Sequence, residues 1–324
     1  MAKEALLIIN PVSGTRSKQG LVSRVEEALG SHDIKVTARY TKANGDATHF
    51  VEEALTQGNA DMVISAGGDG TVNEIAGALS HTRVPLGILP LGSGNGLART
   101  LGIPQDVNEA LKIITAGYTL TCDRGIVNSL PFYCTFGIGL DAAVSEKFAT
   151  MKHRGRTMYI RSLIKEFISY RSRLYALKID GQILTENALL IAVCNASQYG
   201  NNAYIAPKAK LTDGLLDITV IHSGSPLSSM LVGVDMMTGY LDRNTSIQTF
   251  QVKEATISRL DEGPVHLDGD PHVMGKTMHI TCDRNALKVF YSPKNIEFKP
   301  IVSPLRALID DIRYDMLARI RELS

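Results

Sequence analysis

The sequence predicts two domains of different class, a doubly wound α/β domain followed by an antiparallel β-sandwich. Apolar runs alternate with amphipathic segments over the first third of the chain, the pattern of a parallel sheet with helices on both faces. The later segments are short, rich in β-formers and separated by Gly, Pro, Asn and Asp, which is typical of a sandwich. The length of 324 residues also exceeds that of one usual domain. We expect residues 1–122 with 298–324 to form the α/β domain and 123–297 the sandwich.

Strands and helices are expected to alternate regularly in the α/β domain. The first strand, residues 5–9, is entirely apolar and ends at Asn10-Pro11, as a strand buried on both faces does. Gly30 and Gly58 mark the ends of the first two helices. Further strands are expected over 34–40, 61–66 and 84–90, and further helices over 72–79 and 95–116, the last interrupted at Pro104. Ligands of such a domain bind at the carboxyl ends of the strands.

The sandwich is expected to consist of short strands with two helical insertions. The β-rich segments are 124–140, 173–196, 215–222, 249–260, 264–270, 276–282 and 286–293. The helical insertions fall around 141–173 and 226–241. Ser303-Pro304 is a favourable start for a terminal amphipathic helix, which we expect to pack back on the α/β domain.

Composition excludes several classes of function. Lys plus Arg number 34 and Asp plus Glu 33, so the net charge of +1 gives no global attraction to nucleic acid. The four cysteines form no CxxC pair, which favours reduced thiols over a disulfide framework or a zinc site. The histidines show no metal-binding spacing and are interpreted as surface or core residues. Because no apolar window is long enough for a transmembrane anchor, we expect a cytoplasmic protein.

Three glycine-containing loops follow predicted strands of the α/β domain. They cover residues 10–14, 67–71 and 91–95, and parallel strands bring all three to the same edge of the sheet. Glycines allow backbone N–H groups to approach a phosphate closely, and helix N-termini behind the loops favour its negative charge. One such loop is common in tight turns, but three at one edge predict a nucleotide or phosphate site. Asp69 in the second loop places a carboxylate where a magnesium ion or an attacking hydroxyl could meet it.

Taken together, the motifs resemble the diacylglycerol kinase catalytic family, in its bacterial soluble lipid kinase branch. The motifs are NPVSG, GGDGTVNE, LPLGSGNGLAR, the segment from CDRGIVN to FGIGLDAAV, APKAKLTDGLLD and LDGD, and they extend from Ile8 to about Tyr291. GGDGT is shared with NAD kinases and relatives of phosphofructokinase and indicates only the fold superfamily, whereas its conjunction with GSGN and DGD is more specific. The resemblance implies an ATP-dependent kinase acting on a lipid hydroxyl, with its site between the two domains.

The resemblance also implies roles for individual residues. The nucleotide-binding set is Asn10, Ser13, Gly14, Thr41, Gly67, Gly68, Asp69, Gly70, Thr71, Asn73, Ser93 and Asn95. A magnesium (Mg2+) site is implied at Asp213 with the backbone carbonyls of Lys210 and Leu215, although Asp213-Gly214 by itself also fits a hairpin turn. Asp123 and Asn128 match positions that support the site from the domain junction.

The sequence departs from the family at the carboxylate expected to accept the proton. The usual Asp-Gly-Glu is here Asp268-Gly269-Asp270, which withdraws the last carboxylate by about 1.5 Å, one carbon–carbon bond. Asp270 is ranked slightly ahead of Asp268 as proton acceptor, with Asp69 holding magnesium or orienting the nucleophile. The same three residues also fit an ordinary hairpin turn.

A lipid acceptor requires access to a membrane surface. Residues 151–173 carry seven Lys or Arg and one Glu among apolar side chains, which suits peripheral membrane contact or equally a solvated helix packed on the sandwich. The acceptor can be diacylglycerol-like or a sphingoid base, and the oligomeric state, with a homodimer among the options, stays open. Two other functions also stay open, a soluble-metabolite kinase of the NAD kinase type and a catalytically weak protein that senses nucleotide or lipid.

Overall fold

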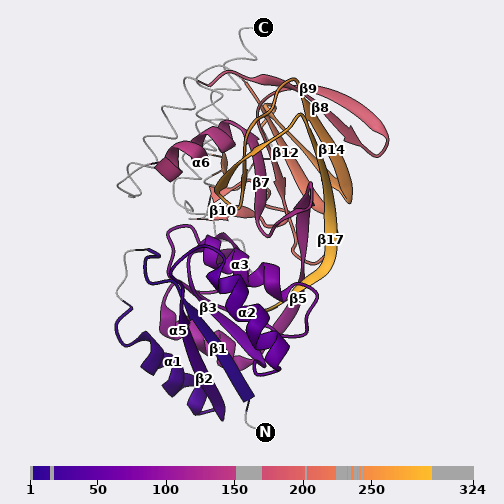
Figure 1. The fold of residues 1–324 in the computed structure, drawn as a ribbon. Helices are drawn as coiled ribbons and strands as arrows, with labels where there is room; N and C mark the ends of the chain where they lie inside the picture. The colour runs from indigo at the N-terminus through magenta and orange to yellow at the C-terminus, as the bar shows by residue number, and fades with distance from the viewer. Residues whose placement is uncertain are drawn as a thin grey trace, which may run out of the picture.

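The fold is taken from a computed structural model that describes residues 3–14, 18–150, 170–200, 203–223 and 244–293, with residues 232, 235, 236, 239 and 241 between them. For 147–150 it describes the backbone only. Three expected segments therefore lie wholly or mostly outside the described residues: the terminal helix from Ser303, the basic segment 151–173 and the insertion around 226–241. Figure 1 shows two lobes, the first built from the start of the chain and the second from its middle and later parts.

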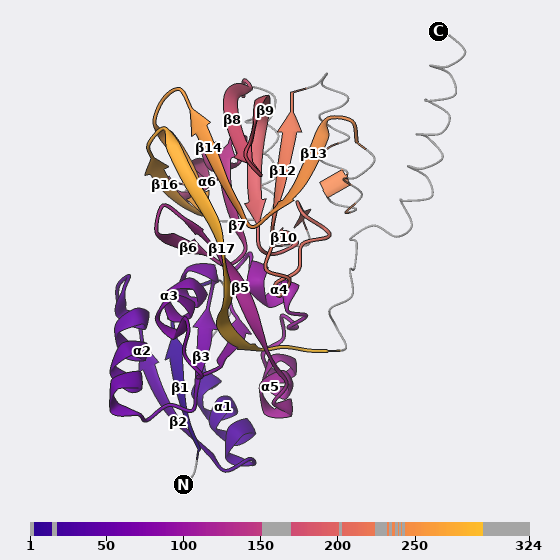
Figure 2. The ribbon, with the colours of Figure 1, turned by 90° about the vertical axis from the view of Figure 1, so that its right-hand side faces the viewer.

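The first lobe is the expected parallel sheet with helices on both faces. Strand β1 (Lys3–Ile9) pairs in parallel with β2 (Ile34–Tyr40) and with β3 (Met62–Gly67), and β3 pairs with β4 (Leu86–Pro90). The helices are α1 (Leu21–Gly30), α2 (Asp46–Gln57), α3 (Asp69–Leu79), α4 (Gly96–Thr100) and α5 (Val107–Ala116). Helices α2 and α3 contact each other on one face, and α1 and α5 on the other (Figure 2). The strands β3 and β4 are buried along their whole length, as their apolar sequences require.

One helix of this lobe begins earlier than the sequence predicts. The expected helix covered 72–79, but α3 begins at Asp69 and so contains Gly70 in its first turn. Glycine in a helix interior is destabilising, but Gly70 lies in the first turn, where backbone N–H groups have no intrahelical partner in any case. The carboxylate of Asp69 in this turn interacts favourably with the helix dipole. The glycine motif is thus the start of a helix as well as a loop.

The second lobe is built from antiparallel strands. They are β5 (Thr119–Val127), β6 (Leu130–Phe132), β7 (Thr135–Gly139), β8 (Arg173–Ile179), β9 (Gln182–Cys194), β10 (Gln198–Gly200), β11 (Ala203–Tyr204), β12 (Leu216–His222), β13 (Ile247–Val252), β14 (Glu254–Arg259), β15 (Gly263–Leu267), β16 (Asp270–Met274) and β17 (Thr277–Phe290). Helix α6 (Leu140–Thr150) packs against β7, β15 and β16. The sequence did not predict β16, an edge strand that begins Asp-Pro and is exposed over most of its length.

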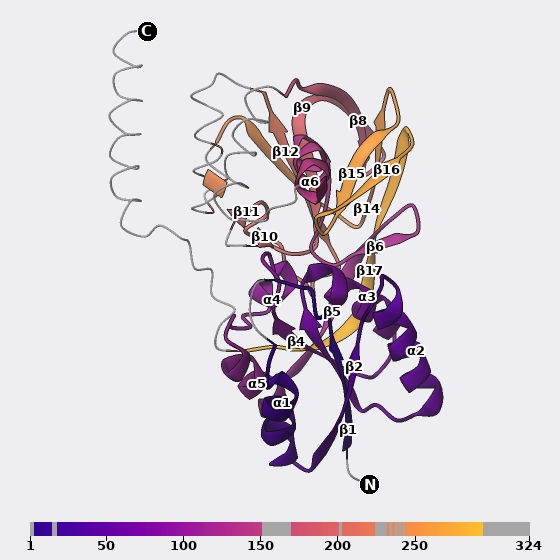
Figure 3. The same cartoon turned by 60° about the vertical axis from the view of Figure 1, so that its left-hand side comes forward.

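Two strands cross from one lobe to the other. The sequence predicts separate strands over 276–282 and 286–293, whereas β17 is one continuous strand with a register shift between Asp283 and Leu287. Asn285 adopts a φ of 53° at this irregularity, which explains why the alternation of side chains is broken there. β17 pairs with β5 along both lobes and with β4 through Val289 and Leu86, so all described strands except β10 and β11 form one connected sheet (Figure 3).

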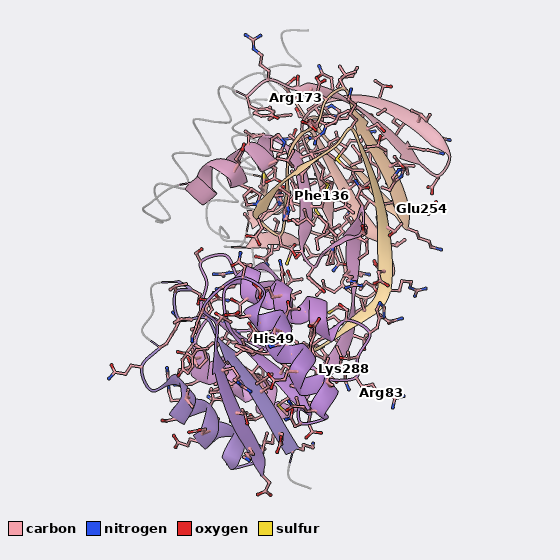
Figure 4. All side chains as sticks on the ribbon, in the orientation of Figure 1. His49, Arg83, Phe136, Arg173, Glu254 and Lys288 are labelled. Atoms are coloured by element: carbon pink, nitrogen blue, oxygen red, sulfur yellow. The ribbon has the colours of Figure 1, made fainter. Side chains whose placement is uncertain are left out.

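Each lobe has its own apolar core. In the first lobe the side chains of β1, β3 and β4 pack against the buried faces of the helices. In the second, Phe136 and its neighbours fill the space between the strands, and Figure 4 places Phe136 inside this lobe, with Arg173 and Glu254 at its surface. A smaller cluster lies under α6. The site described next lies between these cores, where polar residues replace apolar ones.

Candidate active site

The three glycine loops pack against one another at the carboxyl ends of β1, β3 and β4. Gly14 has a φ of +58°, and a Cβ built on it would stand 1.9 Å from the carbonyl oxygen of Leu91 in the third loop. A Cβ on Gly92 would stand 2.5 Å from the Cα of Gly68 in the second loop. Both distances exclude a side chain, so glycine is required for the loops to meet. The sequence correctly predicts that the loops share one edge.

The side chain of Asn10 joins the first loop to the second. Its Nδ2 donates to Oγ1 of Thr71 at 3.1 Å, and its Oδ1 accepts the N–H of Val12 at 3.1 Å. The Ser13 hydroxyl donates to the Asn10 carbonyl at 3.1 Å. Thr41 is buried at the end of β2, with its N–H donated to the Ile9 carbonyl at 2.9 Å. These predicted nucleotide residues therefore shape the loops through bonds within the protein.

In the third loop, Asn95 and Ser93 have different surroundings. Asn95 is buried with a φ of 54°, and its side chain bonds to both backbone groups of Gly92, accepting from the N–H at 3.0 Å and donating to the carbonyl at 2.8 Å. It also donates to Gln105 at 2.7 Å. Ser93 is exposed on the same loop, and Asn73 is half-buried on α3. Asn95 thus holds the loop in shape, while Ser93 remains accessible to a ligand.

Asp69 connects the second loop to the third. Its Oδ1 accepts the N–H of Gly96 and its Oδ2 that of Asn95, both at 2.8 Å. Burial raises the pKa of the Asp69 carboxyl, the two N–H groups lower it, and the charge of Asp270 adds to the rise, so that the pKa is raised overall. Both carboxylate oxygens of Asp69 thus accept backbone N–H groups of the third loop, so Asp69 holds the second and third loops together.

The Asp268-Gly269-Asp270 turn joins β15 to β16 and holds two carboxylates in unlike surroundings. Asp268 has a φ of 51° and accepts three backbone N–H groups, from Tyr133 at 2.8 Å, Cys134 at 2.7 Å and Thr135 at 2.8 Å. Burial raises the pKa of Asp268 to about 6 although these N–H groups lower it. The turn is therefore the hairpin that the sequence allowed, but one whose first carboxylate is anchored in β7 and the segment before it.

Asp270 is exposed and faces the glycine loops. Its Oδ2 lies 3.7 Å from the position that a Cβ would take on Gly70. The charge of Asp270 acts on Asp69, and that of Asp69 acts on Asp268. The structure thus brings together the two segments, 67–71 and 268–270, that the sequence analysis placed on opposite sides of the reaction. An alcohol bound between them would meet the carboxylate of Asp270 on one side and the backbone N–H groups of the second glycine loop on the other.

The predicted metal position lies at the junction of the lobes. Asp213 accepts the N–H of Leu215 at 3.0 Å, and Asp123 accepts the N–H of Gly214 at 2.7 Å. Asp217, which lies on β12 four residues after Asp213, was missed by the sequence analysis, and its buried Oδ2 has no hydrogen-bond partner among the described residues. Burial raises the pKa of Asp217 to about 6, and the charge of Asp213 adds to the rise. A buried carboxylate oxygen beside a second carboxylate fits a hard divalent cation.

Other predicted residues lie elsewhere or act differently. Asn128 is an exposed turn residue whose side chain bonds to Thr277 and His279 of β17, at 3.0 and 2.8 Å. Among the described residues, no three His, Cys, Asp or Glu side chains gather as a ready metal cluster. All four cysteines are free thiols, and Cys122, Cys134 and Cys194 are buried.

Comparison with known proteins assigns the chain to a family. The diacylglycerol kinase catalytic domain matches residues 4–127, and the YegS C-terminal NAD kinase beta sandwich-like domain matches residues 135–291. A protein from Klebsiella pneumoniae named "Probable lipid kinase YegS-like" is 31% identical, with 89% of this chain and 96% of that protein covered. The chain belongs to the diacylglycerol kinase catalytic family. It lies in the YegS-like branch and is a kinase, as the sequence analysis expected, and kinases of this family use ATP.

Further relatives agree with this kinase assignment. The diacylglycerol kinase of Bacillus subtilis is 27% identical, with 83% of this chain and 90% of that protein covered. The crystal structure of a putative diacylglycerol kinase from Bacillus anthracis superposes with a TM-score of 0.76 at 26% identity, covering 90% of this kinase and 96% of that chain. The predicted fold class, an α/β lobe followed by a β-sandwich, is therefore confirmed.

Proposed function

We propose that this kinase transfers the γ-phosphate of ATP to a hydroxyl group of a membrane lipid, either diacylglycerol-like or a sphingoid base. The observation that carries the proposal is the position of Asp270, whose carboxylate lies against Gly70 of the second glycine loop. A kinase of this kind has to align an acceptor hydroxyl with the terminal phosphate and remove its proton. The relatives named lipid kinase and diacylglycerol kinase support a lipid as the acceptor.

Asp270 is the proton acceptor in this proposal, and Asp268 anchors the turn that carries it. Asp268 already accepts three backbone N–H groups, so its carboxylate cannot turn toward a substrate without breaking them. Asp270 is exposed at the start of β16 and directed to the glycine loops. The shorter aspartate side chain is accommodated in this proposal because the turn, held by Asp268, places Asp270 next to Gly70.

The loops serve the nucleotide in this proposal. Gly67, Gly68 and Gly70 leave the N–H groups at the start of α3 accessible, and the α3 dipole favours phosphate at this end. Asp69 keeps the second and third loops at a fixed spacing through its bonds to Asn95 and Gly96. The fixed loops supply the charge stabilisation that phosphoryl transfer requires without rearrangement during the reaction.

Magnesium is proposed at the lobe junction, where Asp213 and Asp217 would hold it together with the backbone carbonyls of Lys210 and Leu215. The orphaned Oδ2 of Asp217 and the adjacent charge of Asp213 support this position. A third carboxylate, that of Asp123, accepts the N–H groups of Gly214 and Asn285 and so fixes the loop to β17. Magnesium bound here would neutralise the buried charge and stiffen the junction between the lobes.

Membrane contact is proposed through the basic segment 151–173, in a cytoplasmic and peripherally associated protein that does not bind nucleic acid. Its Lys and Arg side chains suit anionic head groups, and its apolar side chains suit the boundary with the acyl chains. Among the described residues, no helix is long and apolar enough to cross a membrane. A homodimer is compatible with this arrangement.

The proposal is tested with radiolabelled ATP and a panel of diacylglycerol, monoacylglycerol, sphingosine, ceramide and phosphatidylglycerol, with NAD as a soluble-metabolite acceptor. We expect one lipid to be phosphorylated and both Asp270→Asn and Asp69→Asn to abolish the product. Asp261→Asn is the matched control, because Asp261 is exposed beyond the opposite end of β15 and should leave turnover unchanged. Product from a soluble metabolite alone would indicate a kinase of the NAD kinase type, and ATP binding without any product would indicate a sensing protein.

A further inference from the structure

A buried polar cluster lies directly under the Asp268-Gly269-Asp270 turn. His266, on β15, is 1% exposed, and its Nε2 lies 2.7 Å from Oδ2 of Asp141 in the first turn of α6. The two side chains thus make a short polar contact, in which the ring nitrogen lies next to the carboxylate. The hydroxyl of Tyr199, on β10, donates to the same Oδ2 at 2.6 Å.

The other ring nitrogen of His266 holds the turn. Nδ1 accepts the N–H of Gly269 at 3.2 Å, and Gly269 is the residue between the two carboxylates of the site. Because Nδ1 accepts, its proton is absent and the ring proton is on Nε2, next to the carboxylate of Asp141. The imidazole therefore connects α6 to the peptide that sets the direction of Asp270.

The backbone of β7 leaves space for this cluster. A Cβ on Gly137 would stand 2.2 Å from Nε2 of His266 and 2.3 Å from Oδ2 of Asp141. Burying an imidazole and a carboxylate costs more than burying apolar side chains of the same volume. The charges facing His266 are those of Asp141, Asp268 and Asp270, and core packing alone does not require them.

Tyr199 extends the cluster to the nucleotide side of the site. Its carbonyl oxygen lies 3.3 Å from the position of a Cβ on Gly96, and a Cβ on the neighbouring Gly200 would stand 2.9 Å from the carbonyl oxygen of Gly94. Strand β10 is thus in close contact with the third glycine loop. One connected set of contacts runs from that loop through Tyr199, Asp141 and His266 to Gly269.

We propose that Tyr199, Asp141 and His266 form a positioning network that sets the distance between the third glycine loop and the carboxylate of Asp270. The inference rests on the proposed function, in which Asp270 is the proton acceptor. None of the three residues has to touch the acceptor, because each acts through the turn or through the loop. A displacement of about 1 Å at an aligned proton acceptor can cost roughly 10²-fold in rate.

Two substitutions of His266, each of which replaces one ring nitrogen by an amide group, separate its two contacts. In His266→Asn the amide oxygen can stand near the position of Nδ1 and accept the Gly269 N–H, but the side chain is too short to reach Asp141. In His266→Gln the amide nitrogen can reach Asp141, but no acceptor is left for Gly269. We expect His266→Gln to lower kcat by about 10²-fold and His266→Asn to lower it much less, with KM for ATP unchanged in both.

Tyr199→Phe is the milder third variant, because it removes only the hydroxyl bond to Asp141 and keeps the backbone contact with the third loop. We expect a kcat between those of wild type and His266→Gln. Equal losses in His266→Asn and His266→Gln, or losses that follow the fall in Tm alone, would overturn the inference. So would full activity in all three variants.

The amide of Gly269 gives a readout that does not depend on turnover. We expect its hydrogen exchange, followed by NMR, to be protected in wild type and His266→Asn and accelerated in His266→Gln. If wild type phosphorylates no acceptor, the proposed function fails, and exchange at Gly269 still decides on the network. If wild type is active and Gly269 exchanges alike in both variants, the network fails and the proposed function stands.

Discussion

Three aspartates of the site share one chemistry and differ only in what surrounds them. Asp69 accepts two backbone N–H groups, Asp268 accepts three, and Asp270 is exposed at the head of β16. The sequence identifies all three aspartates but cannot separate their roles. The N–H groups that Asp268 accepts, for example, come from a segment more than a hundred residues away in the chain. Local motifs thus predict which residues meet, whereas long-range backbone bonds determine which carboxylate remains accessible.

The protonation of Asp268 predicts a pH dependence of stability. Burial raises the pKa of Asp268 to about 6 in the folded protein, above the value of 3.8 for an unperturbed aspartate, so the folded state binds the proton more tightly. The protonated Asp268 carboxyl therefore stabilises the folded state below about pH 4, and this stabilisation is lost as the pH rises toward 6. The free energy of unfolding of wild type should therefore fall relative to that of Asp268→Asn across this window, measured by urea unfolding. If the free energy of unfolding of wild type instead rises relative to that of Asp268→Asn, the three N–H groups lower the pKa of Asp268 more than burial raises it.

At the scale of elements, some glycines could carry a side chain without a clash, whereas others lie where a neighbouring residue leaves no space for one. Gly77 lies within α3, and a Cβ there would meet nothing within 4 Å. Gly137 lies in the centre of β7, where a Cβ would overlap His266 and Asp141. The sequence shows both only as glycines inside regular elements, because the neighbours of Gly137 come from α6 and β15.

This contrast predicts opposite effects of the same substitution. Gly77→Ala should stabilise the protein by up to about 1 kcal/mol, since alanine is the better helix former. Gly137→Ala should destabilise it by about 1–3 kcal/mol, because the added methyl group forces the buried side chains of His266 and Asp141 apart. Both are measured by thermal and urea unfolding. A Gly137→Ala variant as stable as wild type would mean that the pair can move without cost.

We expect magnesium to stabilise the protein by binding at the loop before β12. Asp213 and the buried Oδ2 of Asp217 should bind the ion, so magnesium should raise Tm and chelation should lower it. Asp213→Asn and Asp217→Asn should each abolish this rise in the absence of ATP. Asp180→Asn, on the exposed turn between β8 and β9, should retain it. A rise that persists in both site variants would place the ion elsewhere.

At the scale of the whole molecule, the sequence predicts the two fold classes but not how the lobes are joined. The apolar runs identified β1, β3 and β4 correctly, because these strands are largely buried, and side-chain alternation identified β2, whose positions are half-buried or exposed. The crossing of β5 and β17 was not predicted, since β17 appears as two strands around the irregularity at Asn285. Pairing between residues 119–127 and 280–290 is a long-range event that no local pattern reports.

A partly buried polar group joins the crossing strands to the first lobe. Arg124 of β5 donates to Asp283 of β17 at 2.8 Å and to the hydroxyl of Ser80, at the end of α3, at 2.7 Å. His81 lies 3.0 Å from Asp283, and the Tyr133 hydroxyl lies 3.1 Å from that of Ser80. The same helix α3 begins with Asp69 and Gly70, and the N–H of Tyr133 binds Asp268. The group at the crossing is therefore linked to both sides of the site.

Removing Arg124 should consequently affect both stability and turnover. Arg124→Met removes the guanidinium that donates to the partly buried Asp283 and Ser80, and we expect a loss of about 1–3 kcal/mol in the free energy of unfolding. The matched control is Arg39→Met, whose exposed pair with Glu53 spans 3.6 Å and should be worth less than about 1 kcal/mol. Because α3 and the turn at Asp268 are both tied to the crossing, kcat should fall in Arg124→Met at a temperature where the variant is fully folded, and stay unchanged in Arg39→Met. A folded Arg124→Met with normal kcat would show that the lobes are set by the paired strands alone.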